Sequence, residues 1–304
     1  MRFFSIALVS LLFIVACNQT PREIKVVDPT QTSTNHQPRI TDRDYRPLKV
    51  AVSAILSPKE TFESYEEIFR HISRELDVPV EFHQRKTYGE INQMLEEGQL
   101  DFAFICSGAY IDLDQGRGVD LLVVPVSGGE PYYKAYIIAG PASGAQTIED
   151  LRGATFAFTD PLSNTGYLYA KYRLHEIGEN PEDFFETTLF TYGHDISIQM
   201  VAKGIVEAAT VDHLVFEYIK TNNPERVQEI RIVEVSENFG IPPVVASSRL
   251  GSETRQKVLD IFLEMHNHPH ARELINNLLI DKFIEGNDDN YNSIRIMKTS
   301  VNQP

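Results

Sequence analysis

Residues 160–167, which read Asp-Pro-Leu-Ser-Asn-Thr-Gly-Tyr, combine the residue types of an anion-binding turn. They follow a short apolar run, residues 155–159, and open a helical pattern, so they predict a strand-to-helix turn. The first backbone N–H groups of a helix have no partner inside it, and the helix dipole is positive there. Ser163 and Thr165 add hydroxyl donors and Gly166 permits close approach. The turn therefore predicts a socket for a small anion, with a plain N-cap at Ser163 as the alternative.

Two further polar residues follow at positions that favour the same site. His194 comes just before a predicted helix, and Asp212 ends the predicted strand 208–211. A histidine there could donate one more hydrogen bond to an anion or carry a positive charge near pH ~6.5. Asp212 could accept the proton of a monoprotonated phosphate or phosphonate and so reject a fully ionised sulfate-like group. Taken singly, each residue has a structural explanation as a helix-entry residue or an N-cap.

Two other kinds of site use some of the same residue types. Ser163, His194 and Asp212 could form the triad of a hydrolase, but the serine does not lie in the Gly-x-Ser-x-Gly turn that exposes a nucleophile. A histidine tract between two predicted helices lacks acidic or cysteine partners at metal-ligand spacing, so it predicts a solvated loop; its members are His266, His268 and His270. We therefore expect a binding protein and not an enzyme, with no metal and no cofactor.

The N-terminus has the pattern of a secreted lipoprotein. Met1 and Arg2 precede an apolar run that reaches Ala16, which is shorter than the ~20 residues of a membrane-spanning helix. Residues 14–17, Ile-Val-Ala-Cys, resemble a bacterial lipobox, which implies a signal peptide over 1–16 and a lipid on Cys17. Residues 17–46 are polar, lack an apolar period and predict a disordered tether. We expect a protein on the periplasmic or extracytoplasmic face, lipid-anchored to the membrane; cleavage elsewhere, with Cys17 incidental, is the alternative.

Composition narrows the choice of partners. The formal net charge is −15 for 304 residues, which does not suit nucleic acid or anionic membrane surfaces. With Cys17 assigned to the anchor, Cys106 is the only other cysteine, so there is no disulfide framework. An anion must therefore be held by local dipoles against the field of the whole molecule.

The order of elements predicts two α/β lobes. Strands 48–53, 78–82 and 101–106 alternate with helices 59–76 and 88–97, which implies a parallel sheet with its ligand edge near 53–57 and 107–110. A second α/β series lies between chain breakers near Gly140 and Gly240, and residues from 252 onward read as helical. We expect lobe 1 to comprise 47–138 plus 241–304 and lobe 2 to comprise 139–240, with two hinge crossings and a ligand in the cleft.

The motifs in this order resemble the phosphate/phosphite/phosphonate-binding family of ABC-transporter periplasmic proteins. The resemblance covers roughly 48–297. Its most specific part is the leucine-arginine-glycine strand entry at 151–153, followed by the aspartate-proline, serine and glycine-tyrosine of residues 160–167. Further matches, in order, are 101–104 with Tyr110, 193–194, 203–204, 208–212, 241–244, Tyr291 and 294–295.

The resemblance implies a type II periplasmic binding protein fold, α/β, with each lobe a mixed, mainly parallel sheet flanked by helices. It implies capture of a small phosphorus oxyanion and delivery to an ABC permease, or else signalling to a membrane sensor kinase. Its ligand-binding residues fall on Ser163, Asn164, Thr165, Gly166, His194, Asp212 and Tyr110. Relatives often carry a hydroxyl where this chain has Asn164, so the identity of the anion stays open.

Overall fold

The computed structural model describes residues 25–26, 46–53, 58–113 and 118–302. The expected signal peptide 1–16, Cys17 and most of the expected tether lie outside these residues. Within the tether, Lys25–Val26 form a short strand, β1, which pairs in parallel with β3 (Val80–His83). The expectation that all of 17–46 lacks structure is therefore wrong at these two residues.

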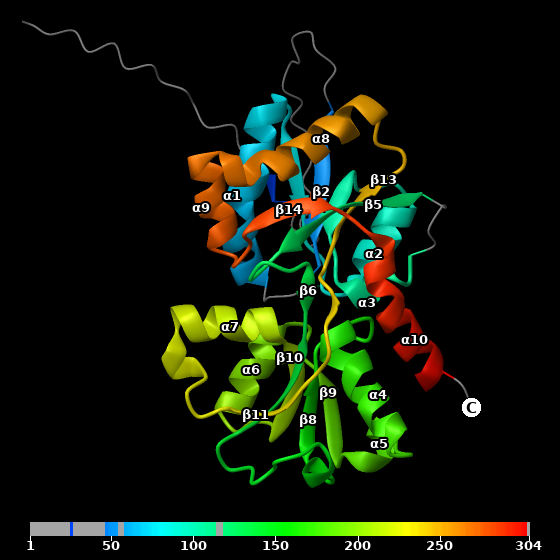
Figure 1. Cartoon of the computed structure of the whole chain (residues 1–304), viewed down its shortest axis with the longest axis vertical. Helices are drawn as coiled ribbons and strands as arrows, with labels where there is room; N and C mark the ends of the chain where they lie inside the picture. Colours follow the sequence, from blue (N-terminus) through cyan, green and yellow to red (C-terminus); the bar gives the residue numbers. More distant parts are fainter. Residues whose placement is uncertain (1–24, 27–45, 54–57, 114–117, 303–304) are drawn as a thin grey trace, which may run out of the picture.

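The upper lobe in Figure 1 contains a seven-stranded sheet in the order β1-β3-β2-β4-β13-β5-β14. Its remaining strands are β2 (Leu48–Val52), β4 (Phe102–Phe104), β5 (Val119–Val126), β13 (Val244–Ser247) and β14 (Lys282–Glu285). Its helices are α1 (Pro58–Leu76), α2 (Tyr88–Glu96), α3 (Ser107–Tyr110), α8 (Ser252–Glu264) and α9 (Pro269–Asn276). A buried aromatic cluster that includes Phe69, Phe102, Phe104, Phe262 and Phe283 holds α1 and α8 on the sheet.

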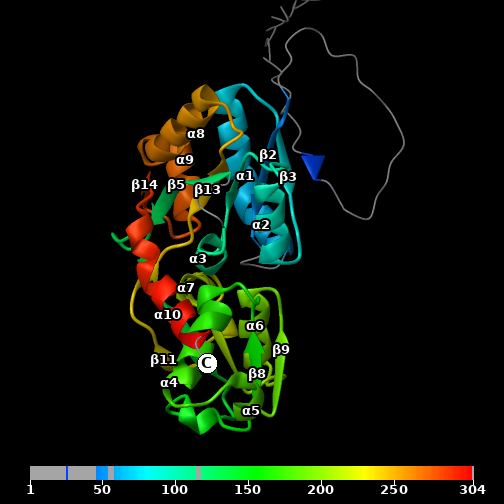
Figure 2. The ribbon, with the colours of Figure 1, turned by 90° about the vertical axis from the view of Figure 1, so that its right-hand side faces the viewer.

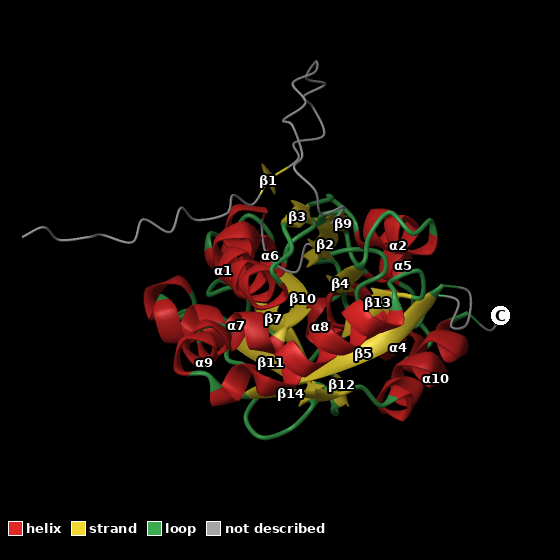
Figure 3. Cartoon of the chain, turned by 90° about the horizontal axis from the view of Figure 1, so that it is seen from above, coloured by secondary structure: helices red, strands yellow, loops and turns green. Residues whose placement is uncertain are grey.

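The lower lobe contains a five-stranded sheet in the order β11-β7-β10-β8-β9. The strands are β7 (Ala135–Ala139), β8 (Thr155–Phe158), β9 (Thr187–Phe190), β10 (Ala208–Asp212) and β11 (Arg231–Val235). The helices are α4 (Tyr169–Glu176), α5 (Pro181–Phe184), α6 (His194–Ala202) and α7 (His213–Asn222). Viewed from above, helices lie on both sides of the strands (Figure 3). No helix in the described part of the chain is long and apolar enough to cross a membrane.

Two crossings join the lobes side by side. The first runs through β6 (Tyr132–Tyr133) and the second through β12 (Phe239–Gly240), and the two strands pair antiparallel. The backbone N–H of Ala135 donates to Ser236 Oγ at 2.8 Å, which ties the first crossing to the second. The crossings therefore form a two-stranded hinge.

The C-terminal helix α10 (Asn292–Val301) extends the connection between the lobes. It follows β14 of the upper sheet and packs against α4 of the lower lobe (Figures 1 and 2). At its start, the Tyr291 hydroxyl donates to the carbonyl of Ile241 at 2.8 Å. The C-terminal segment thus contacts the hinge and the lower lobe together.

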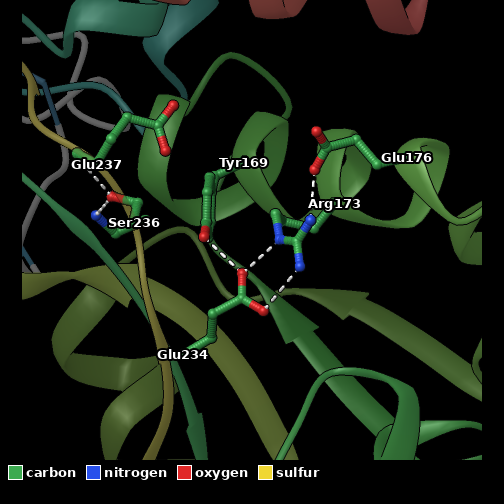
Figure 4. A network of polar contacts seen from close by, with 7 residues as sticks. Tyr169, Arg173, Glu176, Glu234, Ser236 and Glu237 are labelled. Atoms are coloured by element: carbon green, nitrogen blue, oxygen red, sulfur yellow. Dashed lines mark hydrogen bonds and ion pairs between the residues drawn. The ribbon is translucent and has the colours of Figure 1, made fainter.

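A polar network holds α4 to the strand that leads into the second crossing (Figure 4). Glu234 on β11 accepts hydrogen bonds from the Tyr169 hydroxyl at 2.5 Å and from Arg173 Nε at 2.6 Å. Ser236 Oγ donates to the carbonyl of Glu237 at 2.7 Å. The strand that leads into the hinge is therefore anchored to the helix that follows the turn at residues 160–167.

The structure corrects three details of the expected architecture. Residues 135–138 belong to β7 of the lower sheet, so the expected lobe boundary between 138 and 139 is too late. Helix α10 contacts the lower lobe, although residues 241–304 were expected to belong to lobe 1, the upper lobe. β14 interrupts the expected helical tail because Phe283 alternates inward in the upper core. Both sheets are mixed as expected, but neither is mainly parallel. Parallel pairs make up three of the six described strand pairs in the upper sheet and two of the four in the lower sheet. The other pairs are antiparallel because β5, β7, β11, β13 and β14 run opposite to their neighbours.

Candidate ligand-binding site

The turn after β8 forms as a capped helix entry. Ser163 is the N-cap of a π-helical turn, Asn164–Leu168, and its Oγ accepts a hydrogen bond from the backbone N–H of Gly166 at 2.9 Å. Gly166 lacks room for a side chain, because a Cβ there would lie 2.5 Å from Thr159 Cβ. The N-cap alternative is therefore correct for Ser163, and the close approach that Gly166 permits is to Thr159.

The next two residues of the turn face the interior between the lobes. Asn164 and Thr165 are fully buried. Asn164 Nδ2 donates to the Tyr133 hydroxyl at 3.1 Å, and that hydroxyl lies 2.6 Å from Ser107 Oγ. This chain of contacts joins the turn, the first crossing and the start of α3.

Several buried polar side-chain atoms in the turn and in the upper lobe have no hydrogen-bond partner among the described residues. They include Thr165 Oγ1 and Asn164 Oδ1 in the turn, Tyr88 OH at the start of α2 and Ser53 Oγ after β2. The Tyr88 phenol interacts electrostatically with Cys106, Tyr133 and Asp212, which places it beside the turn. Leaving a buried polar group unpaired costs ~1–3 kcal/mol, so such a group calls for a functional explanation.

His194 is buried at the start of α6, and its tautomer follows from its partners. Nδ1 accepts a hydrogen bond from the backbone N–H of Asp212 at 3.0 Å, and Thr159 Oγ1 lies 3.1 Å from the same atom. The ring proton must therefore sit on Nε2. Burial lowers the pKa of His194 to about 3. The imidazole is thus neutral at pH 7, so of the two expected roles, hydrogen-bond donor or positive charge, the geometry favours the donor.

Asp212 ends β10 and caps α7, with Oδ1 accepting from the backbone N–H of Leu214 at 2.7 Å. Burial raises its pKa to about 7. The neighbouring His213 lies 3.9 Å away, but its Nδ1 accepts from the backbone N–H of Lys134 and burial lowers its pKa. No cation among the described residues therefore lies beside Asp212, and its carboxyl exchanges a proton near neutral pH.

The two lobes are in contact around the turn. The Tyr88 backbone N–H donates to Asp160 Oδ2 at 3.1 Å, and Lys86 lies over the Tyr192 ring at 4.3 Å. A Cβ at Gly108 on α3 would lie 2.3 Å from the carbonyl oxygen of Leu162. Since these contacts pair the upper lobe with the lower one, the structure is a closed form.

The structure brings together most of the expected site residues. Thr159 and Thr210 connect them, since the Thr210 hydroxyl donates to the carbonyl of Thr165 at 2.6 Å on the strand that ends at Asp212. The group comprises Ser163, Asn164, Thr165, Gly166, His194 and Asp212. Tyr110 lies apart: its hydroxyl donates to Asp288 at 2.8 Å and its ring packs on Tyr291.

Sequence reasoning missed the tyrosines that do lie beside the turn, Tyr88 and Tyr133. Tyr133 belongs to a hinge crossing, which carries no helix or strand period. Tyr88 follows Thr87, whose hydroxyl caps α2 in a capping box. The sequence signal that could have identified Tyr88 is an aromatic residue at the first position of a capped helix. Ser53 and Ser107 do lie at the predicted ligand edge; residues 54–57 of that edge are outside the described part.

Neither alternative site is assembled. Ser163 Oγ is bonded to Gly166 and lies 4.0 Å from Cys106 Sγ, while His194 Nδ1 bonds the backbone and not the carboxylate of Asp212. A Ser-His-Asp relay needs the serine on the imidazole and the carboxylate on its other nitrogen. No group of three or more His, Cys, Asp or Glu residues in the described chain could hold a metal ion.

Comparison with known proteins places this geometry in a family. Residues 50–291 match the model of a family described as "ABC transporter, phosphonate, periplasmic substrate-binding protein". The chain is 22% identical over 251 residues to the phosphonates-binding periplasmic protein of Escherichia coli, covering 81% of this chain and 74% of that protein. It is 24% identical over 250 residues to the phosphate-import protein PhnD of Mycolicibacterium smegmatis, covering 77% of each.

Solved structures show the same fold. A binding-protein component of an ABC phosphonate transporter from Pseudomonas aeruginosa superposes with a TM-score of 0.80 at 22% identity, covering 85% of this chain and 87% of that one. PhnD1 from Prochlorococcus marinus, in complex with methylphosphonate, gives 0.76 at 17% identity, covering 86% and 100%. The fold is that of type II periplasmic binding proteins, and the chain belongs to the family of periplasmic substrate-binding proteins of phosphonate ABC transporters.

Proposed function

We propose that this chain binds a small phosphorus oxyanion, a phosphonate, phosphite or phosphate, between its lobes and delivers it to an ABC permease. The observation that carries the proposal is a set of buried hydroxyls from both lobes that have no partner among the described residues: Thr165 Oγ1, Tyr88 OH and Ser53 Oγ. A tetrahedral oxyanion uses several neutral donors at once, and donors fixed in a closed site need no reorganisation when the ligand binds.

The remaining expected residues have complementary roles in this proposal. His194 donates from Nε2, because Nδ1 is already an acceptor. Rotating the Asn164 amide by 180° would let Oδ1 accept from Tyr133 and leave Nδ2 to donate to the anion, since the phenol can serve in either role. Ser163 and Gly166 shape the turn. Tyr110 is the last residue of α3, and because its hydroxyl donates to Asp288 it is not proposed as a ligand contact.

Asp212 selects among oxyanions through a shared proton. With a pKa near 7 it either donates a proton to a dianion or accepts one from a monoprotonated ligand. Sulfate brings no proton, so it is bound only while Asp212 is itself protonated. We expect sulfate to be excluded above pH ~7 because two negative charges would then meet in a buried site.

Calorimetry of the protein lacking residues 1–17 tests the proposal. Phosphate, phosphite, methylphosphonate, 2-aminoethylphosphonate and sulfate are titrated separately at pH 8. Saturable heat with at least one phosphorus compound and none with sulfate is the expected result. No heat with any phosphorus compound would remove the proposed function.

We further propose that Cys17 carries a lipid that tethers the protein outside the cytoplasm. The support is the apolar run before Cys17 and its lipobox-like residues 14–17. Cells fed a labelled fatty acid should incorporate it into the wild-type chain and not into Cys17→Ser. Equal incorporation by both chains would contradict the anchor.

A further inference from the structure

A cavity of about 90 Å³ lies between the lobes beside Asp212. The upper lobe contributes Tyr65 on α1 and Phe104 at the end of β4, and the lower lobe contributes Leu214 and Val215 on α7. The second crossing and the loop before β14 complete the wall with apolar side chains, among them Ile241 and Leu278. Among the described residues that line the cavity, Asp212 is the only carboxylate, and most of the others are apolar.

The cavity adjoins the candidate site through Asp212. That residue lies on the strand whose Thr210 bonds the turn at Thr165, and its backbone bonds His194. The Tyr65 phenol, on the far wall of the cavity, interacts electrostatically with the Asp212 carboxyl. A ligand whose oxyanion occupies the turn can therefore direct a substituent past Asp212 into the cavity.

We propose that this cavity holds the carbon substituent of a phosphonate, so that the protein prefers short alkylphosphonates to phosphate, phosphite and aminoalkylphosphonates. This inference rests on the proposed function, since it assigns the substrate class of the same site. A dry apolar cavity of ~150 Å³ takes up benzene, so the smaller cavity here suits a chain of about two or three carbon atoms.

The lining argues against an ammonium group as the occupant. An ammonium has three N–H donors, and a carboxyl that is already bonded to the Leu214 backbone can satisfy only part of them. Beside Asp212, the described lining offers only the hydroxyls of Tyr65, Ser127 and Tyr218 as side-chain acceptors, whereas Phe104, Val215 and Ile241 offer none. Burying such a group without its hydrogen bonds costs affinity, whereas a methyl group in the same place gains it.

A ligand series on the wild-type chain tests the inference at pH 7. Calorimetry is run with phosphite, methyl-, ethyl-, propyl-, hexyl- and 2-aminoethylphosphonate. We expect affinity to rise about fourfold per methylene from methyl to propyl and to fall at hexyl, because each methylene leaves water for the cavity. The 2-aminoethyl compound, which has the same chain length as the propyl compound, should bind at least tenfold more weakly than it.

The outcomes separate this inference from the proposed function. Equal affinity for phosphite and all short-chain phosphonates would overturn the inference and leave the proposed function standing. Tighter binding of the 2-aminoethyl than of the propyl compound would also overturn it, because Asp212 would then pair with an ammonium. Absence of binding by every phosphorus compound would instead remove the proposed function.

A filled cavity gives an independent check. Ile280 lines the cavity and is 7% exposed, and Ile280→Phe should abolish the gain from methyl to propyl while methylphosphonate affinity stays within about twofold. Ile205→Phe is the matched control, since Ile205 is 60% exposed and does not line the cavity. Melting curves establish that both variants fold. A folded Ile280→Phe protein that keeps the full gain would overturn the inference, and if it does not fold the wild-type series decides alone.

Discussion

Ser163 and Thr165 lie two residues apart in one turn, yet their hydroxyls do different things. Ser163 Oγ caps the backbone at Gly166, whereas Thr165 Oγ1 is buried without a partner among the described residues. The first hydroxyl therefore stabilises the fold, and the second costs stability unless a ligand accepts from it. This difference separates the structural role of Ser163 from the binding role that we propose for Thr165.

Replacing these two residues should separate stability from affinity. Thr165→Val keeps the shape and removes the unpaired hydroxyl, so we expect unchanged or slightly higher stability and at least tenfold weaker binding, about 1.4 kcal/mol. Ser163→Ala should lower the free energy of unfolding by about 1 kcal/mol through loss of the cap. Urea unfolding and calorimetry measure the two effects. Full affinity in Thr165→Val would move the anion away from this turn.

Asp212 and His194 should have opposite effects on stability as pH changes. Burial raises the pKa of Asp212 to about 7 from 3.8, so between these values the folded chain holds a proton that the unfolded chain has lost. Its contribution to stability is present below pH ~3.8 and is lost as pH rises towards 7. Burial lowers the pKa of His194 to about 3 from 6.5, so its contribution is present above pH ~6.5 and is lost as pH falls.

The variant Asp212→Asn tests this balance. Between pH ~4 and ~6.5 the two contributions nearly cancel in the wild type. In the variant only the His194 contribution remains. The free energy of unfolding should therefore rise with pH by up to ~1.4 kcal/mol per pH unit relative to the wild type. Urea unfolding at pH 4.5 and 6.5 measures it, and equal pH slopes in the two proteins would contradict the buried titration.

Sequence patterns located the turn, His194 and Asp212 because each sits where a strand gives way to a helix, and such junctions can be read from periodicity. They also placed Tyr110 in the site, whereas in the structure its hydroxyl donates to Asp288, which lies 178 positions away in sequence. The local sequence does not show in which direction an aromatic side chain points from a four-residue helix such as α3. The site tyrosines, Tyr88 and Tyr133, depend on that kind of long-range placement too.

At the scale of elements, the closed form depends on how near α3 comes to the turn at residues 160–167. A Cβ at Gly108 would lie 2.6 Å from the backbone nitrogen of Asn164 and 2.3 Å from the carbonyl of Leu162. Both are backbone atoms, which cannot move aside without displacing the turn. Glycine at this position is therefore a condition for closure.

Gly108→Ala should hinder closure without unfolding either lobe. We expect at least tenfold weaker ligand binding with little change in the melting temperature, because the added methyl meets the other lobe. Gly89→Ala is the matched control: its Cβ would lie 3.8 Å from Leu162 Cδ1, an ordinary contact. Identical affinities for Gly108→Ala and Gly89→Ala would show that closure does not require this approach.

The alternating strands and helices of the sequence predicted the lobes, since buried strands and amphipathic helices carry strong periods. The boundary of the lower lobe was placed late because Gly140 marks the far end of β7, whereas only Lys134 separates the hinge at Tyr132–Tyr133 from β7 and no chain breaker lies between them. A glycine indicates that a helix or strand ends, but it does not indicate to which lobe that element belongs. The C-terminal helix α10 was assigned to the wrong neighbour for the same reason.

At the scale of the whole molecule, closure around the site buries the thiol of Cys106. Its Sγ lies 4.0 Å from Ser163 Oγ, at the contact between α3 and the turn, and the residue is 3% exposed. Removing residues 1–17 leaves Cys106 as the only cysteine. Its reactivity therefore reports separation of the lobes at the site itself.

Alkylation of Cys106 tests the central claim, that a phosphorus oxyanion is held between closed lobes. The chain lacking residues 1–17 is mixed with a maleimide at pH 8, with and without saturating methylphosphonate, and with sulfate as the control anion. We predict that methylphosphonate slows labelling at least tenfold and that sulfate leaves the rate unchanged. Equal labelling rates under all three conditions would contradict the claim.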